Sequence, residues 1–110
     1  MKKTKIAIPL YLSELVIIQD KNWKKVNRKY KINGEKYFGA FTFRNLKKSG
    51  RMQYVVCFDS NPSNSLIAHE ATHLTNMLFK DFGFKLDVDN DEPQAYLLAW
   101  FVEQIDEFLK

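Results

Sequence analysis

Cysteine and histidine are scarce in this chain, and their scarcity limits the chemistry that it can perform. Cys57 is the only cysteine among 110 residues, so no disulfide can form within the chain, as is usual in a reducing compartment. Its β-rich surroundings predict a buried strand residue. Only two histidines are present, which excludes a metal site with three histidine ligands.

A long hydrophobic run is also lacking. Pro9, Ser13 and Glu14 interrupt residues 6–18, the most apolar stretch near the N-terminus, whereas a membrane span needs about 20 apolar residues. No small-residue cleavage pattern follows this run, so it does not resemble a secretory signal. We therefore expect a cytoplasmic protein that makes no membrane contact.

Glycine and proline are few, at 4 and 3 residues, whereas 45% of the chain is hydrophobic and 15% is aromatic. This composition excludes a disordered or low-complexity protein. A chain of 110 residues has room for one hydrophobic core. We therefore expect one domain over residues 1–110, which must carry any functional site directly.

Acidic residues are scarce in the first half of the chain. Residues 1–55 hold 14 Lys or Arg and 3 Asp or Glu, a net charge of +11, whereas residues 56–110 hold 3 and 10, a net charge of −7. A basic half can bind nucleic acid or an acidic protein. The alternative is a solvated lysine-rich face that docks on the chain's own acidic half.

Hydrophobic periodicity and turn signals predict an α+β fold. We expect a small antiparallel sheet of about four strands, with a central helix and a C-terminal helix packed on it. The expected strands cover residues 5–11, 14–19, 36–44 and 52–58. The expected helices cover residues 22–30, 63–80 and 92–110.

The helix expected over residues 63–80 carries the sequence His-Glu-Ala-Thr-His at positions 69–73. Because His69 and His73 are four residues apart, both imidazoles project from one side of the helix and can reach one zinc ion. Glu70 follows the first histidine, where its carboxylate can act as general base toward an attacking water. We place both histidines at the border of the helix's apolar arc, and the opposite arc comprises Thr72, Thr75 and Asn76.

A third metal ligand must be a carboxylate or Cys57. Glu92, at the start of the last helix, is our first choice because a helical hairpin would fold that helix beside the histidines. Asp91 and Asp89 are the next candidates. The alternative is that Asp91 or Glu92 only caps the helix.

With these residues, the chain resembles the gluzincins, zinc peptidases in which a glutamate is the third ligand. It is also similar to small metallopeptidases of phages and prophages and, more distantly, to the ImmA/IrrE group of bacterial regulatory peptidases. In those proteins the motif helix is followed by a helix beginning Glu-x-x-Ala, here residues 92–95. The resemblance covers residues 63–101 and implies His69, His73 and Glu92 as zinc ligands, Glu70 as base and the cytoplasm of a bacterial or phage-infected cell as location.

Peptide hydrolysis also needs a group that stabilises the oxyanion. Tyr96, one turn after Glu92, is the candidate, although an aromatic residue there is also typical of a core position. Residues 52–58 are expected to offer a strand edge to an extended peptide or protein substrate.

Two alternatives to a zinc metallopeptidase stay open at this point. One is a non-catalytic zinc-binding phage or bacterial protein that binds a protein or nucleic-acid partner through its basic half. The other is a metal-independent fold in which the motif occurs by chance.

Overall fold

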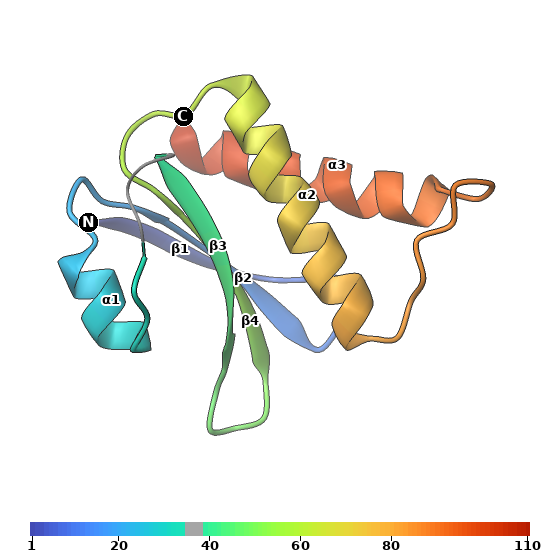
Figure 1. The fold of residues 1–110 in the computed structure, drawn as a ribbon, viewed down its shortest axis with the longest axis horizontal. Helices are drawn as coiled ribbons and strands as arrows, with labels where there is room; N and C mark the ends of the chain where they lie inside the picture. Colours follow the sequence, from blue (N-terminus) through green and yellow to red (C-terminus); the bar gives the residue numbers. More distant parts are fainter. Residues whose placement is uncertain (35–38) are drawn as a thin grey trace.

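The computed structural model describes residues 1–34 and 39–110. They form a four-stranded sheet with helices on both faces (Figure 1). The strands are β1 (Lys2–Ala7), β2 (Ser13–Gln19), β3 (Ala40–Leu46) and β4 (Met52–Phe58). The helices are α1 (Lys24–Tyr30), α2 (Asn64–Asp81) and α3 (Glu92–Leu109). The predicted α+β class and strand number are confirmed.

The sheet is mixed rather than antiparallel throughout. Its strand order is β1-β2-β4-β3, and the outer pairs β1·β2 and β3·β4 are antiparallel. The central pair β2·β4 is parallel, with Ser13 opposite Met52 and Gln19 opposite Phe58. The chain between these strands forms α1 and then β3 at the far edge, so β4 enters beside β2 in the same direction. Hairpin signals in the sequence predict local pairs but not how two hairpins join.

The main core lies between the sheet and the helices α2 and α3. Alternate residues of the central strands face these helices, as two-residue strand periodicity requires. The fully buried members from the strands are Leu15, Ile17, Tyr54, Val56 and Phe58, and those from the helices are Ala71, Leu74, Leu78, Phe101 and Ile105.

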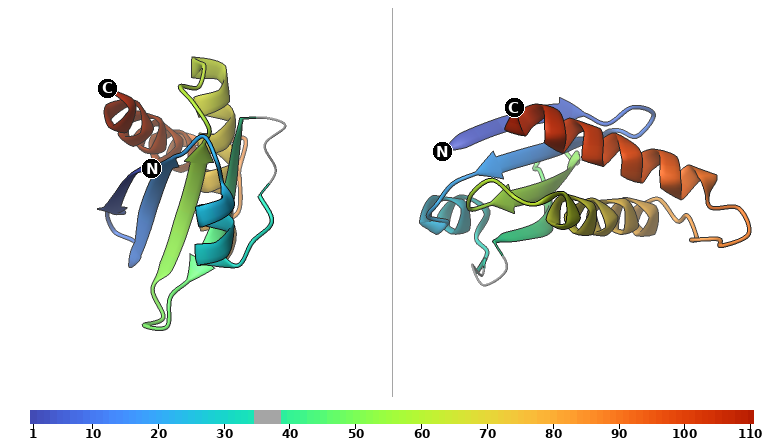
Figure 2. Two further views of the ribbon diagram at one scale, coloured as in Figure 1. Left: turned by 90° about the vertical axis from the view of Figure 1, so that its left-hand side faces the viewer. Right: turned by 90° about the horizontal axis from the view of Figure 1, so that it is seen from above.

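The opposite face of the sheet is covered in part by α1, as the two turned views show (Figure 2). Trp23 and Val26 pack there on Val16, Ile18, Val55 and Cys57. The central strands are therefore buried on both faces, which explains why their sequences are almost continuously apolar. Cys57 is fully buried, as the sequence predicts.

Truncation of Phe101 is expected to destabilise the fold strongly. Its side chain is fully buried in the main core, and Phe→Ala at such a site costs about 3–5 kcal/mol of unfolding free energy. Tyr96→Ala is a matched control on the same helix, because this ring is 73% exposed and surface changes cost within about 0.5 kcal/mol. Urea denaturation of both variants measures the difference, and equal losses would contradict the packing described.

The helix α2 begins and ends where its sequence specifies. Ser63 is the N-cap residue, and its Oγ accepts a hydrogen bond from the Leu66 amide at 3.2 Å, as capping serines do. After the helix, Gly83 adopts a positive φ of 74°, a conformation that glycine adopts without steric cost. This 18-residue helix is therefore fixed at both ends, close to the predicted residues 63–80.

Other predicted boundaries differ by a few residues. The first strand ends at Ala7 rather than residue 11, because the chain turns over residues 9–12, where Leu10 has a positive φ. Residues 36–38, where the third strand was expected to begin, lie outside the described residues. No helix in the described part of the chain is long and apolar enough to cross a bilayer.

Candidate metal centre

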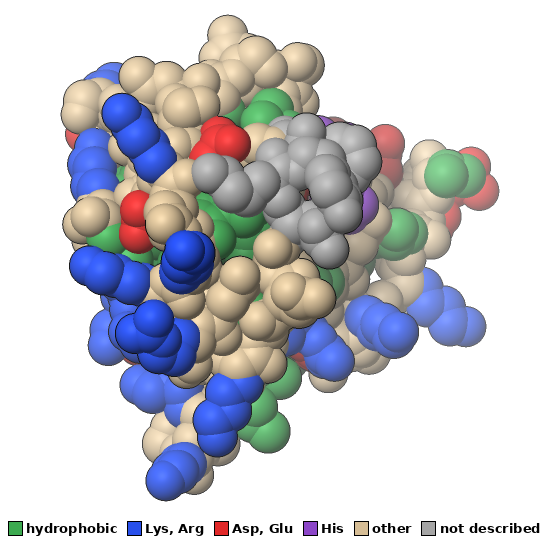
Figure 3. Space-filling model, turned by 60° about the vertical axis from the view of Figure 1, so that its left-hand side comes forward, with side chains coloured by type: hydrophobic (Ala, Val, Ile, Leu, Met, Phe, Trp, Pro, Cys, Tyr) green, Lys and Arg blue, Asp and Glu red, His purple; other side chains and the backbone are tan. Residues whose placement is uncertain are grey.

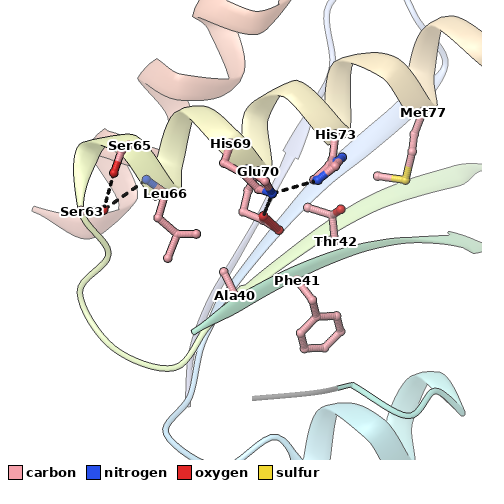
Figure 4. Close-up of a pocket in the computed structure, with 10 residues that line it drawn as sticks. All are labelled: Ala40, Phe41, Thr42, Ser63, Ser65, Leu66, His69, Glu70, His73 and Met77. Carbon is pink, nitrogen blue, oxygen red and sulfur yellow. Dashed lines mark hydrogen bonds and ion pairs between the residues drawn. The ribbon is translucent and has the colours of Figure 1, made fainter. Parts of the chain in front are cut away.

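The motif side chains of α2 point into a groove between this helix and the edge strand β3 (Figure 4). The groove has a volume of about 970 Å³. Its described lining residues from β3 are Ala40, Phe41 and Thr42, and those from α2 include Leu66, His69, Glu70, His73 and Met77. The groove thus combines an apolar surface with three groups that can ligate a metal.

The two histidine rings meet at their Nε2 atoms, which are 3.1 Å apart. The ring centroids are 4.7 Å apart, and the ring planes are nearly perpendicular, at 82°. Glu70 Oε2 lies 3.7 Å from His69 Nε2. Ligand atoms of His69, Glu70 and His73 all lie within 4.8 Å of one another, and no other group of three possible ligands occurs in the described residues.

These atoms fit a zinc ion in type and in spacing. Zinc takes imidazole nitrogen at about 2.0–2.1 Å, so two nitrogens in a tetrahedral site are about 3.3 Å apart. The observed 3.1 Å between His69 Nε2 and His73 Nε2 is close to this value. Both histidines are exposed, so an ion could enter from the groove without a rearrangement of the core.

Glu70 differs from the histidines because it is buried. Its side chain is 5% exposed, whereas that of His69 is 64% exposed. Burial disfavours the charged carboxylate and raises the pKa of Glu70, while the neighbouring His73 and His69 partly oppose this effect,. A carboxylate with a raised pKa is a stronger base at neutral pH, which suits proton transfer.

The structure does not bring the predicted third ligand to this site. Glu92, Asp91 and Asp89 are exposed at the start of α3 and the preceding loop, and none of them joins the His69, Glu70 and His73 group. The histidines are the sixth and tenth of the 18 residues of α2, about 12–18 Å along the axis from its C-terminal end at a rise of 1.5 Å per residue. The chain enters α3 through a loop that leaves the C-terminal end of α2, and the first residues of α3 lie away from the first half of α2 (Figure 1).

Cys57 is also not placed to bind a metal beside the histidines. It packs with Trp23 and Val26 on the face of the sheet that α1 covers. Burial raises the pKa of its thiol to about 12, so the thiolate that binds metals is disfavoured. The third-ligand candidates considered from the sequence, namely Glu92, Asp91, Asp89 and Cys57, are therefore not placed beside the histidines, whereas the carboxylate of Glu70 is.

The predicted oxyanion group and the predicted substrate strand also lie outside the groove. Tyr96 is 73% exposed on α3 and does not line the groove. The expected substrate strand Met52–Phe58 is β4, which is paired on both sides and has no free edge. The prediction for this strand is wrong, because the strand next to the motif helix in sequence lies inside the sheet.

The strand β3 contributes residues that sequence reasoning missed. Ala40 and Thr42 line the groove opposite the histidines. The sequence pattern that could have revealed them is the alternation of residues 40–43. Phe41 and Phe43 pack toward α1, so Ala40 and Thr42 face the other side of the sheet. The alternation alone does not say which face of β3 meets α2; the contacts between β3 and α2 in the folded chain show it.

Comparisons with protein-family models, with curated proteins and with solved structures give no match. The resemblance to gluzincins therefore depends on the motif residues and their arrangement on α2.

Proposed function

We propose that this protein is a zinc-dependent metallopeptidase. The observation that carries the proposal is the grouping of His69 and His73, with Nε2 atoms 3.1 Å apart, beside the buried carboxylate of Glu70 in an open groove. Two histidines that only stabilised the fold would not need a buried carboxylate such as Glu70 beside them, because burial of an ionisable group costs free energy.

The residues of the site divide the chemistry between them. His69 and His73 would hold the zinc ion, which as a Lewis acid would make water a better nucleophile at neutral pH. Glu70 accepts the proton of the attacking water and passes it to the departing amine. Its burial favours the first of these steps, since a carboxylate removed from solvent binds a proton more strongly,.

The groove suggests an extended peptide as substrate. The strand β3 forms an edge of the sheet, so its outer backbone groups can pair with an added strand. Ala40, Leu66 and Met77 supply apolar contacts along the groove. We therefore propose a segment of a protein in the cytoplasm of a bacterial or phage-infected cell as the substrate class.

Zinc loading and chelation test this function. Protein purified without added metal, then titrated with zinc, is expected to bind one equivalent and to cleave members of a mixed peptide library. Removal of zinc with a chelator should abolish cleavage, and zinc should restore it. Mass spectrometry of the products identifies the hydrolysed bonds. One bound zinc without any cleavage would contradict the peptidase and favour a non-catalytic zinc protein.

A further inference from the structure

A second groove lies on the face of the sheet opposite the motif helix. The helix α1 covers only part of this face, and beside it the surface is hollowed to a volume of about 550 Å³. Four lysines line the groove, namely Lys3, Lys5, Lys29 and Lys47. Lysine and arginine side chains spread over much of the surface on the α1 side of the molecule (Figure 3).

Strand register explains why the lysines of β1 gather here. Lys3 is paired with Ile18 and Lys5 with Val16, and both partners pack toward α1. Because paired residues on neighbouring strands point to the same face, both lysines project on the α1 side. The helix supplies Lys29 from its last turn.

The base of the groove is a chain of polar side chains. Asn45 Nδ2 donates to Gln53 Oε1 at 2.9 Å, and Gln53 Nε2 donates to Glu14 Oε1 at 3.1 Å. Burial alone would raise the pKa of Glu14, but the Gln53 hydrogen bond and the nearby cations lower it. The groove therefore has an ordered polar floor rather than an apolar one.

One carboxylate does not neutralise these cations. Glu14 lies 4.0 Å from Lys5 and 3.7 Å from Lys47. Lys3 and Lys29 instead lie over the Tyr30 ring, at 5.7 and 5.4 Å from its centroid, and no carboxylate partner for them occurs in the described residues. The pKa of Lys29 is lowered chiefly by its interaction with Lys3 and to a smaller extent by burial, as expected for neighbouring ammonium groups.

The acidic half of the chain does not cover this surface. All the described residues that line the groove belong to residues 1–55, and the Arg44–Asp81 ion pair, which joins the two halves, is not among them. At this groove, therefore, the basic face is not lined by the chain's own acidic half. Further exposed cations flank the groove at α1 and at the β3–β4 turn, namely Lys24, Lys25, Arg28, Lys48 and Arg51.

We propose that this basic groove binds the phosphate backbone of a single nucleic-acid strand. Lys3 and Lys29 have no carboxylate partner among the described residues and lie at a concave polar surface that suits phosphate oxygens. Cations beyond both ends suit an extended polyanion better than one isolated phosphate. The groove is on the other side of the sheet from His69 and His73, so this activity does not depend on the metal site.

The test compares two double variants with the same change of charge. Lys3→Ala/Lys29→Ala removes the two groove lysines that have no carboxylate partner in the described part of the chain, whereas Lys80→Ala/Lys85→Ala removes two exposed lysines outside the groove. Fluorescence anisotropy with a labelled strand of about 12 nucleotides, within the usual site sizes, measures affinity at several salt concentrations. A chelator is present throughout, so the result is independent of zinc.

We expect the groove variant to lose at least about tenfold in affinity at low salt, and its salt slope to fall by about 1.4, or about 0.7 for each lost phosphate contact. The control should stay close to the parent. Lys3→Arg/Lys29→Arg should retain binding, and unchanged thermal midpoints show that each variant folds.

Equal losses in the groove and control variants would overturn the proposal, because net charge alone would then explain binding. Absence of strand binding by the parent, or binding of inorganic tripolyphosphate alone, would also overturn it. A clear preference for duplex over single strand would assign the surface to a different ligand and contradict the proposal.

Discussion

Glu70→Gln is expected to abolish peptide hydrolysis while zinc binding persists. The amide cannot accept a proton from water, and loss of a general base costs about 10²–10⁴-fold in rate. The histidine donors stay in place, because the substitution changes neither His69 nor His73. Single-turnover cleavage assays, with zinc content measured on the same sample, check both parts of the result.

The stability of this variant separates lost chemistry from lost folding. Burial raises the pKa of Glu70, so ionisation of this group destabilises the fold as pH rises above its unfolded value near 4.5. At neutral pH the uncharged glutamine avoids that cost. The thermal midpoint of the Glu70→Gln variant should therefore not fall below that of the metal-free parent. Glu70→Gln that cleaves peptides at the parental rate would rule out the proposed base.

His73→Ala should remove high-affinity zinc binding. The variant leaves His69 as the only histidine donor, and we expect zinc affinity to fall by more than the roughly 10–100-fold that loss of a merely orienting group costs. Because His73 is exposed, the substitution creates no cavity in the core. Competition with a zinc-binding dye measures the affinity.

Glu92→Gln is the matched comparison for His73→Ala. In the structure Glu92 stands apart from the histidines, so this substitution should leave zinc affinity within about twofold of the parent, well below the cost of losing an orienting group. Glu92→Gln with a loss as large as that of His73→Ala would instead support the gluzincin ligand set and require α3 to move on metal binding.

Local features of the fold are largely readable from the sequence. The histidine spacing, the Ser63 cap and the turn at Gly83 depend on neighbours within a few residues, and α2 forms as they predict. Strand β4 also matches its predicted bounds at residues 52–58. Capping, periodicity and turn preference act over this range, so one sequence contains them.

Features that depend on distant packing were not readable. Thr75 was expected on the solvent side of α2 but is fully buried, because α3 widens the covered arc of the helix beyond its apolar residues. The same holds for the placement of Glu92, which depends on how a ten-residue loop, residues 82–91, carries the chain into α3. No periodic signal encodes such a path.

The parallel pairing of β2 with β4 also bears on how the protein folds. Its paired residues, such as Ser13 and Met52, are 39 positions apart in the chain, whereas the two outer pairs are local hairpins. Closing the long intervening loop costs entropy before any central contact forms, and such non-local pairing slows folding. We expect the two hairpins to form first and the pairing of β2 with β4 to limit the folding rate.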